Sequence, residues 1–468
     1  MVWINLGKNK PSQDSLALTI TPINYILLLL AEEERRIVAL YICNEFQLEL
    51  HVIKDMVFMF QSWPYFLMFM ILENLILWIE RKPTMRINDG ITSLSHGLIQ
   101  EIGRLLFRGG ESWLYVWIYE HWRITELPWD SIVTWYIAAI GVDFCYYWVH
   151  RACHEIHILW AQHQVHHSSE DYNLAVGLRQ SAIQGWCGFI FYLPLALFIP
   201  PSVFLTHQQF NLLYQFWIHT ETIKSLGPLE WIFNTPRHHR VHHGSVLYCL
   251  DKNYGGTLII WDRMFGTFAE EREKEEIIYG LVLNQPSFNP VFLQLFYNMN
   301  VYKKFMMMEG WRNKISAIIK GPSWLPGQKW TGNDADKIEV KAREKFDVIL
   351  PTWCNVYLVL HFIATVLSFQ DLAQRHLSMT PLSVLISVIY MIISLSIIGL
   401  MFEDRPNVWL LEMVRCAIFA TLMYKDALSI DLPYLKWFYT LSTFFWLLHS
   451  FKLVRVHSTI QKRLSTSE

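Results

Sequence analysis

The residues of this chain best suited to chemistry are histidines gathered in one stretch. Twelve of the 19 histidines fall between residues 150 and 243, where a uniform spread would place about four. Three short patterns occur there: His150 opens HxxxH, His163 opens HxxHH, and His239 opens a second HxxHH. The eight histidines of these three boxes are His150, His154, His163, His166, His167, His239, His242 and His243.

The spacing within the boxes suits metal binding. Residues three or four apart lie on one face of a helix, about 5–6 Å apart at their Cβ atoms. One HxxHH box can therefore present three imidazoles, and adjacent histidines can be divided between two ions. Eight imidazoles are too many for one tetrahedral ion, so the pattern predicts two metal ions. Iron and zinc both accept imidazole, but the seven cysteines form no CxxC pair, which argues against a structural zinc finger.

Other polar residues near the boxes are candidates for supporting roles. His219 ends the apolar stretch 186–219 and is a candidate ninth ligand. Asp143 lies seven positions before His150, about 20° from it around the helix, and could accept a proton from the second ring nitrogen of a ligand. Glu155 follows His154 and could serve a neighbouring box in the same way. Alternatively, both carboxylates face water near the helix end.

The composition indicates a membrane protein. Of the 468 residues, 53% are hydrophobic and only 17% are charged, whereas soluble proteins carry about 25% charged residues. The net charge is −2, with 39 basic and 41 acidic residues. This balance shows no basic footprint for nucleic acid, so we expect no nucleic-acid partner.

The elements that must position the histidines are therefore membrane helices, each of which needs about 20 apolar residues to cross a bilayer. The clearest candidates are 56–79, 131–149, 380–401 and 433–453, and the weaker ones are 91–107, 355–370 and 407–424. The stretch 186–219 holds two apolar runs interrupted at Pro200-Pro201, which predicts a helical hairpin. Segment 112–125 mixes Trp and Tyr with charge and could lie at the interface.

Flanking charge predicts the orientation of these helices. The first one leads into the basic segment 80–86, which is typical of the cytosolic side. Counting spans from there places His150, His219 and the polar stretch 220–350 in the cytosol. We therefore predict an all-α integral membrane bundle of about seven to nine spans, with a cytosolic histidine-rich cap that holds a di-metal site.

The expected organisation has four parts. Residues 1–55 form an N-terminal segment outside the membrane, and 56–285 form the core with the histidine boxes. Residues 286–352 form a cytosolic loop region, and 353–468 form the C-terminal transmembrane helices with a basic tail.

A metal site of this kind suits the oxidation of lipids. Attack on an unactivated C–H bond needs a redox metal that binds dioxygen, placed where an apolar tail can reach it from the bilayer. The chain has no dinucleotide-binding glycine pattern, no P-loop and no fused haem segment. Electrons must therefore come from a separate protein or from a small diffusible cofactor.

The boxes resemble those of the fatty acid hydroxylase superfamily, a group of membrane di-iron enzymes that includes sterol desaturases. Several surrounding segments are similar to the alkylglycerol monooxygenase family. They include LPWDS at 127–131, GVDFCYYWVHRACHE at 141–155, WAQHQVHHSSEDYNLAVGLRQS at 160–181, NTPRHHRVHHG at 234–244 and IIWDRMFGTF at 259–268. The resemblance is close over roughly residues 125–285.

The resemblance implies an endoplasmic reticulum enzyme that hydroxylates the ether-linked carbon of alkylglycerols drawn from the bilayer. It implies two iron ions, dioxygen, and tetrahydrobiopterin as a diffusible reductant. The eight box histidines would be the metal ligands, supported by Glu155 and His219. No pterin motif is visible, so the pterin-binding residues stay open. Tyr254 either lines the pocket or belongs to a packed turn.

Two alternatives remain open at this point. The first is a sterol or fatty acyl hydroxylase or desaturase with the same metal site, supplied with electrons by cytochrome b5. The second is a metal transporter, which should carry ionisable ligands at mid-membrane depth. Glu73 and Arg415 are the main charged residues inside the expected spans, whereas the histidines lie beyond span ends.

Overall fold

The computed structural model describes residues 58–272, 274–425, 428 and 432–451, which belong to one compact unit, Phe46–Glu468. The expected N-terminal segment 1–55 and most of the basic tail lie outside the described residues. Those described form no strand, and only two isolated β-bridges join Phe233 to Leu258 and Gly244 to Tyr279. The prediction of an all-α fold is confirmed for this part of the chain.

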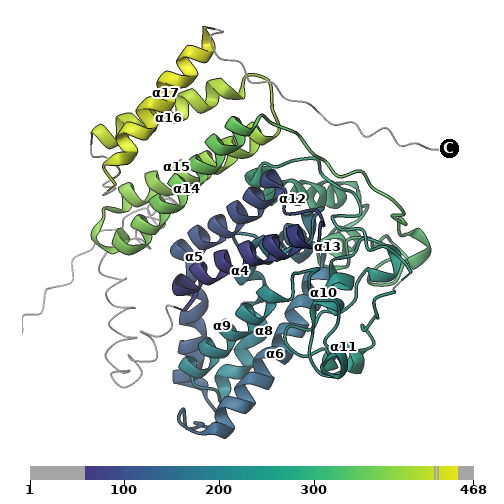
Figure 1. The fold of residues 1–468 in the computed structure, drawn as a ribbon. Coiled ribbons are helices and arrows are strands. Elements are labelled where there is room, and N and C mark those ends of the chain that lie inside the picture. The colour runs from purple at the N-terminus through teal and green to yellow at the C-terminus, as the bar shows by residue number, and fades with distance from the viewer. Residues whose placement is uncertain (1–57, 273, 426–427, 429–431, 452–468) are drawn as a thin grey trace, which may run out of the picture. The chain divides into compact units, whose positions relative to one another are not determined.

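Fourteen α-helices run through the described residues (Figure 1). The first seven are α4 (Phe58–Ile79), α5 (Ile87–Trp122), α6 (Ile132–Glu155), α7 (His157–His163), α8 (Gln184–Tyr192), α9 (Pro201–Trp217) and α10 (Pro236–His243). The others are α11 (Ile260–Phe265), α12 (Pro290–Met307), α13 (Trp311–Ile319), α14 (Thr352–Arg375), α15 (Pro381–Phe402), α16 (Val408–Tyr424) and α17 (Tyr434–Ser450).

Three helical segments among the described residues are long and apolar enough to cross a membrane. They are Ile132–Glu155, Thr352–Ser378 and Pro381–Phe402. Shorter apolar helices cover Trp63–Ile79 and Gln184–Leu197. The prediction of membrane helices is therefore confirmed, although 355–370, expected to be weak, is among the three. The expected span 433–453 overlaps α17 (Tyr434–Ser450), which is not among these three candidates in the described residues.

Three segments differ from the sequence-based expectation. Segment 91–107 and segment 112–125 up to Trp122 belong to the single 36-residue helix α5. No proline lies between residues 84 and 127, and glycine costs a helix only about 1 kcal/mol relative to alanine, so Gly109-Gly110 does not break it. The expected loop region 286–352 contains two helices, α12 and α13.

Proline and capping residues set where several helices begin. Pro201, Pro236, Pro290 and Pro381 each occupy the first turn of a helix, where the missing N–H costs no hydrogen bond. The predicted hairpin over 186–219 is thus divided at Pro200-Pro201, with α9 starting at the second proline.

Two apolar cores hold the helices that carry the histidine boxes and the C-terminal helices. The first core includes buried residues of α5, α6 and α9 and of the turn Leu193–Leu197. The second joins α14 and α15 to α5 and includes Trp446 of α17. Helix α12 also packs against both α7 and α15, so α5 and α12 connect the region of the histidine boxes with the C-terminal helices.

Candidate metal centre

Each histidine box lies on a helical turn at the end of an element. His150 and His154 occupy the last turns of α6. His163 ends α7, and the backbone stays right-handed helical through Gln164 and Val165 into the short turn that contains His166 and His167. The third box fills the second half of α10. The i, i+3 and i+4 spacing therefore places the rings of each box on neighbouring positions of one turn.

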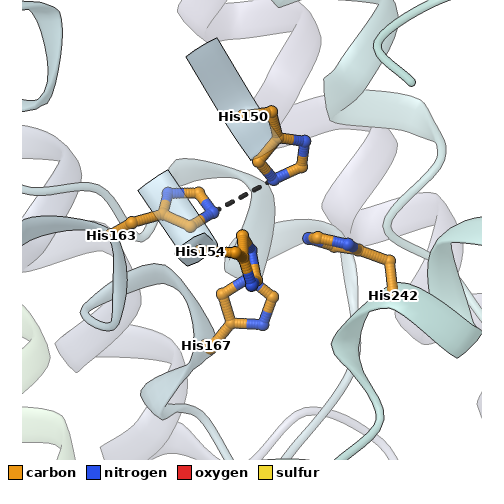
Figure 2. Close-up of side chains that lie close together, drawn as sticks. All are labelled: His150, His154, His163, His167 and His242. Atoms are coloured by element: carbon orange, nitrogen blue, oxygen red, sulfur yellow. Dashed lines mark hydrogen bonds between the residues drawn. The ribbon is translucent and has the colours of Figure 1, made fainter. Parts of the chain in front are cut away.

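The structure gathers five of these imidazoles into one group. Each contributes a ring nitrogen, and these nitrogens all lie within 4.8 Å of one another; the residues are His150, His154, His163, His167 and His242. Figure 2 shows the five rings converging, with Nε2 of His150 and Nε2 of His163 3.0 Å apart. All five residues are buried.

A second group of four imidazoles lies beside the first. It consists of His166, His219, His239 and His243, again with ring nitrogens within 4.8 Å of one another. Nε2 of His219 lies 3.2 Å from Nε2 of His166, 3.1 Å from that of His243 and 3.0 Å from that of His239. The rings of His167 and His243 stack with centroids 4.4 Å apart, which places the two groups in direct contact.

The division between the groups follows a rule within each HxxHH box. The i and i+4 histidines join one group and the i+3 histidine joins the other: His163 and His167 separate from His166, and His239 and His243 separate from His242. All nine histidines expected to bind metal are thus brought together. Their role as ligands stays a prediction.

Backbone carbonyls orient four of the rings. Nδ1 of His150 lies 2.9 Å from the carbonyl oxygen of Tyr254, and Nδ1 of His242 lies 2.8 Å from that of Lys252. Nδ1 of His219 and of His166 similarly face the carbonyls of Gln215, at 2.6 Å, and Arg179, at 3.2 Å. A carbonyl can only accept, so Nδ1 of His150, His242 and His219 carries the proton and Nε2 directs a lone pair into the group. Nδ1 of His166 also lies 3.2 Å from the side-chain amide nitrogen of Gln180.

Burial keeps the imidazoles outside the spanning helices neutral. Desolvation, followed by the neighbouring imidazoles, holds the pKa of His163, His167 and His239 well below the usual value. No carboxylate belongs to either group, so nothing there stabilises imidazolium. Neutral imidazole is the form that binds a metal.

The residues present fit a metal ion in each group. Nε2 of His154, His167 and His242 is buried without a hydrogen-bond partner, and such unpaired groups are costly unless something satisfies them. Nitrogens bound at right angles to one ion at about 2.1 Å lie about 3 Å apart. The nitrogen separations of 3.0–3.2 Å around His219 match that spacing.

Asp143 has different partners from those expected. Its Oδ1 accepts hydrogen bonds from the Asn211 amide and the Thr257 N–H, both at 2.7 Å. Its Oδ2 accepts from the Leu258 N–H at 3.1 Å and the Trp261 indole at 2.9 Å. These donors contain no histidine, so Asp143 holds the chain segment that follows the third box.

Glu155 also lies away from the imidazole rings. Its Oε1 accepts a hydrogen bond of 2.9 Å from Arg151 in an ion pair along α6, and its backbone carbonyl accepts one from the indole of Trp330. The expected hydrogen bond, donated by a box histidine and accepted by Glu155, does not appear among these contacts.

Several buried charges that support the boxes were not anticipated. Arg179 pairs with Asp89 at 3.1 Å and donates to Ser168, while its carbonyl holds His166. Asp262 accepts hydrogen bonds from the N–H groups of Tyr254 and Gly255 and so fixes the carbonyl that faces His150. No histidine-box pattern includes these residues.

Comparison with known proteins agrees with this architecture. A fatty acid hydroxylase family model matches residues 135–267, and an alkylglycerol monooxygenase C-terminal domain model matches residues 354–441. No solved structure matches the chain.

The curated relatives match over most of their length. The alkylglycerol monooxygenase of Xenopus tropicalis is 46% identical over 80% of this chain and 83% of its own. That of Danio rerio is 45% identical over 84% of this chain and 89% of its own. The human alkylglycerol monooxygenase is 45% identical over 77% of this chain and 81% of its own.

Proposed function

Because the chain belongs to the alkylglycerol monooxygenase family, we propose that this membrane monooxygenase cleaves the ether bond of alkylglycerols at a di-iron centre. The observation that carries the proposal is the pair of adjacent buried imidazole groups, which contain nine histidines and no carboxylate. The nine residues are the eight box histidines and His219. We assign one iron ion to each group.

The donor set suits iron that activates dioxygen. Groups of five and four nitrogens each leave at least one position free on an octahedral ion, as iron oxygenases require. Bound iron would supply the redox chemistry that activates dioxygen. The protein orients the rings through the carbonyls of Tyr254, Lys252, Gln215 and Arg179 and keeps bulk water away by burying the groups.

The proposed reaction hydroxylates the carbon next to the ether oxygen. One oxygen atom of dioxygen enters the C–H bond, and the other leaves as water with two electrons and two protons supplied by tetrahydrobiopterin. The product is a hemiacetal, which collapses to a fatty aldehyde and glycerol or its derivative. The sequence shows no fused haem segment and no dinucleotide-binding pattern, and the resemblance to alkylglycerol monooxygenases is what supports tetrahydrobiopterin as the separate reductant.

The proposed location is the endoplasmic reticulum membrane, with the metal centre facing the cytosol. His150 and His154 lie in the last turns of the candidate span Ile132–Glu155, so the centre lies close to one end of that helix. An ether lipid in the bilayer could then reach the site while the pterin arrives from the cytosol.

The proposal is tested with purified full-length protein in lipid nanodiscs. We expect aldehyde formation from an alkylglycerol with tetrahydrobiopterin as the sole reductant, and about two irons per chain by elemental analysis. Replacing any one box histidine, for example His150→Ala, should abolish turnover and lower the iron content while the protein still accumulates. His121→Ala is the control, because His121 is exposed on α5.

Three results would count against the proposal. Turnover that requires cytochrome b5 would indicate a sterol or fatty acyl hydroxylase of the same superfamily. A single zinc per chain would remove the di-iron centre, and full activity in most of the histidine variants would show that the boxes are not ligands.

A further inference from the structure

Helix α12 exposes an apolar stripe along its whole length. The exposed fractions of Phe292, Leu295, Met299, Tyr302 and Met306 are between 44% and 62%. These residues are three or four positions apart, so they lie on one face of the helix. The opposite side buries Leu293 and Val301, which means that α12 is apolar on two faces.

Helix α13 continues this exposed apolar surface. Its residues Trp311, Ile315 and Ile319 are four positions apart and are 74%, 52% and 44% exposed. Ala317 is buried on its other side. The helices α12 and α13 pack against each other and form a hairpin with one unpartnered apolar side among the described residues. Soluble proteins rarely leave a large contiguous apolar patch exposed to water.

The charge of the hairpin is strongly basic, although that of the whole chain is not. Residues 290–320 contain five basic residues and one acidic residue, Glu309, whereas the full chain has a net charge of −2. The basic residues are Lys303, Lys304, Arg312, Lys314 and Lys320. None occupies the exposed stripe of α12, and Lys303 follows Tyr302 at the edge of the stripe. This pattern is typical of helices that lie on anionic lipid surfaces.

The hairpin begins where a candidate membrane span ends. Glu403, just after the last residue of α15, accepts hydrogen bonds from the Ser287 hydroxyl and from the Phe288 N–H. Asn289 caps α12 and also accepts a hydrogen bond from Ser396 of α15. The start of α12 is therefore held at the end of the most apolar candidate span, which is the level of a bilayer surface.

We infer that the α12–α13 hairpin lies on the lipid bilayer, with its apolar stripe in the boundary between headgroups and acyl chains. Lys303, at the edge of the stripe, and Arg312, on α13, are the exposed basic residues that face the lipid phosphates. The amines of Lys304 and Lys314 instead donate to carbonyls within the chain, and that of Lys320 lies over the ring of Trp324. A second copy of this chain is a poorer occupant, because two hairpins packed face to face would bring their basic residues together. The hairpin is too polar to cross the bilayer and is not among the candidate spans of the described residues.

The buried face of the same helix contacts the element that carries the second histidine box. The Gln164 amide donates to the carbonyl of Leu293 at 3.0 Å, and the Gln162 amide donates to Asn298 at 2.8 Å. The hairpin therefore couples the position of α7 to the lipid surface on which it rests. This coupling sets the depth of the imidazole groups relative to the bilayer.

Photocrosslinking of the full-length protein in nanodiscs tests the inference. The photoreactive residue p-benzoylphenylalanine is placed at Met299 or at Ile315, and, as a matched control, at Asn300, which is exposed but lies about 100° further around α12. Irradiation should give lipid adducts at Met299 and Ile315 that exceed those at Asn300 by at least about fivefold, as measured by mass spectrometry.

Other outcomes would overturn the inference. A crosslinked dimer formed at Met299 would assign the stripe to a second copy of the chain. Equal lipid adducts at Met299 and Asn300, or none at Met299 and Ile315, would show that the stripe does not face lipid. The readout needs neither bound metal nor turnover, so its failure is separate from any failure of the proposed reaction.

Discussion

Backbone carbonyls set the direction of several of the imidazoles. His150 and His242 both depend on the segment after the third box, because their Nδ1 atoms face the carbonyls of Tyr254 and Lys252. That segment is held in turn by carboxylates, since Asp262 accepts from the Tyr254 N–H and Asp143 accepts from the Thr257 and Leu258 N–H groups. Residues without contact to an imidazole nitrogen therefore position the rings.

Replacement of Asp143 tests this positioning role. Asp143→Ala should lower stability by about 3 kcal/mol or more, because four buried donors lose their acceptor. Asp143→Asn keeps one accepting oxygen and should have an intermediate effect. Both variants should also retain less iron than the unaltered protein, and Asp143→Ala should retain less than Asp143→Asn. Thermal unfolding in detergent and elemental analysis measure the two effects.

Ile140→Ala is the control for this pair, because Ile140 lies on the same helix and is 52% exposed. A smaller loss of stability in Asp143→Ala than in Ile140→Ala would contradict the role assigned to Asp143. Full iron content in an unstable Asp143→Ala protein would limit that role to folding.

The sequence predicts that the nine imidazoles come together, but it does not predict the hydrogen bonds that orient them. Box spacing follows the helical repeat, so it shows which rings share a face. It does not show which carbonyl faces each Nδ1, because every residue carries a carbonyl. Asp143 shares the face of His150, but seven residues separate them by about 10 Å along the axis, too far for a hydrogen bond. A shared helical face therefore does not by itself predict a contact, because the rise along the axis must also bring the two side chains within reach.

At the scale of elements, the short helix α10 is tied by Arg240 to the segment that follows His219. This side chain lies between His239 and His242 in sequence but makes its contacts elsewhere. Its guanidinium donates to both carboxylate oxygens of Glu271, at 2.9 and 2.8 Å, and to the carbonyls of Ile223 and Lys224. The segment after His219 and the third box are therefore joined by one buried arginine.

Arg240→Lys should destabilise α10, because lysine cannot reproduce the two parallel hydrogen bonds to Glu271. We expect a loss of about 1–3 kcal/mol and faster hydrogen exchange in residues 236–243. Arg237→Lys is the matched control, because Arg237 belongs to the same helix, is more exposed and forms longer ion pairs. It should change stability by no more than about 1 kcal/mol. Equal effects of the two variants would mean that Arg240 does not secure the helix.

At the scale of the described chain, α5 and α12 link the helices that carry the histidine boxes to the C-terminal helices. The C-terminal helices contain a third buried group with metal-binding atoms, His361, Glu412 and Cys416. The guanidinium of Arg415 lies 2.7 Å from both oxygens of Glu412 and 2.8 Å from Nδ1 of His361. The Arg415 guanidinium already occupies this group, so we expect the group to join helices rather than to bind a metal.

Glu412→Gln tests that distinction. The substitution leaves Arg415 buried without its counter-charge, which typically costs about 3–5 kcal/mol. Hydrogen exchange should accelerate in α14–α17, because Arg415 also donates to Tyr390 of α15 and contacts His361 of α14. Exchange in α6–α10 and the iron content should stay unchanged.

Asp371→Asn is the control, because it removes only a partly exposed ion pair within α14. Loss of a metal from Glu412→Gln would instead identify a third metal site, and equal acceleration in α6–α10 would show that both regions unfold together.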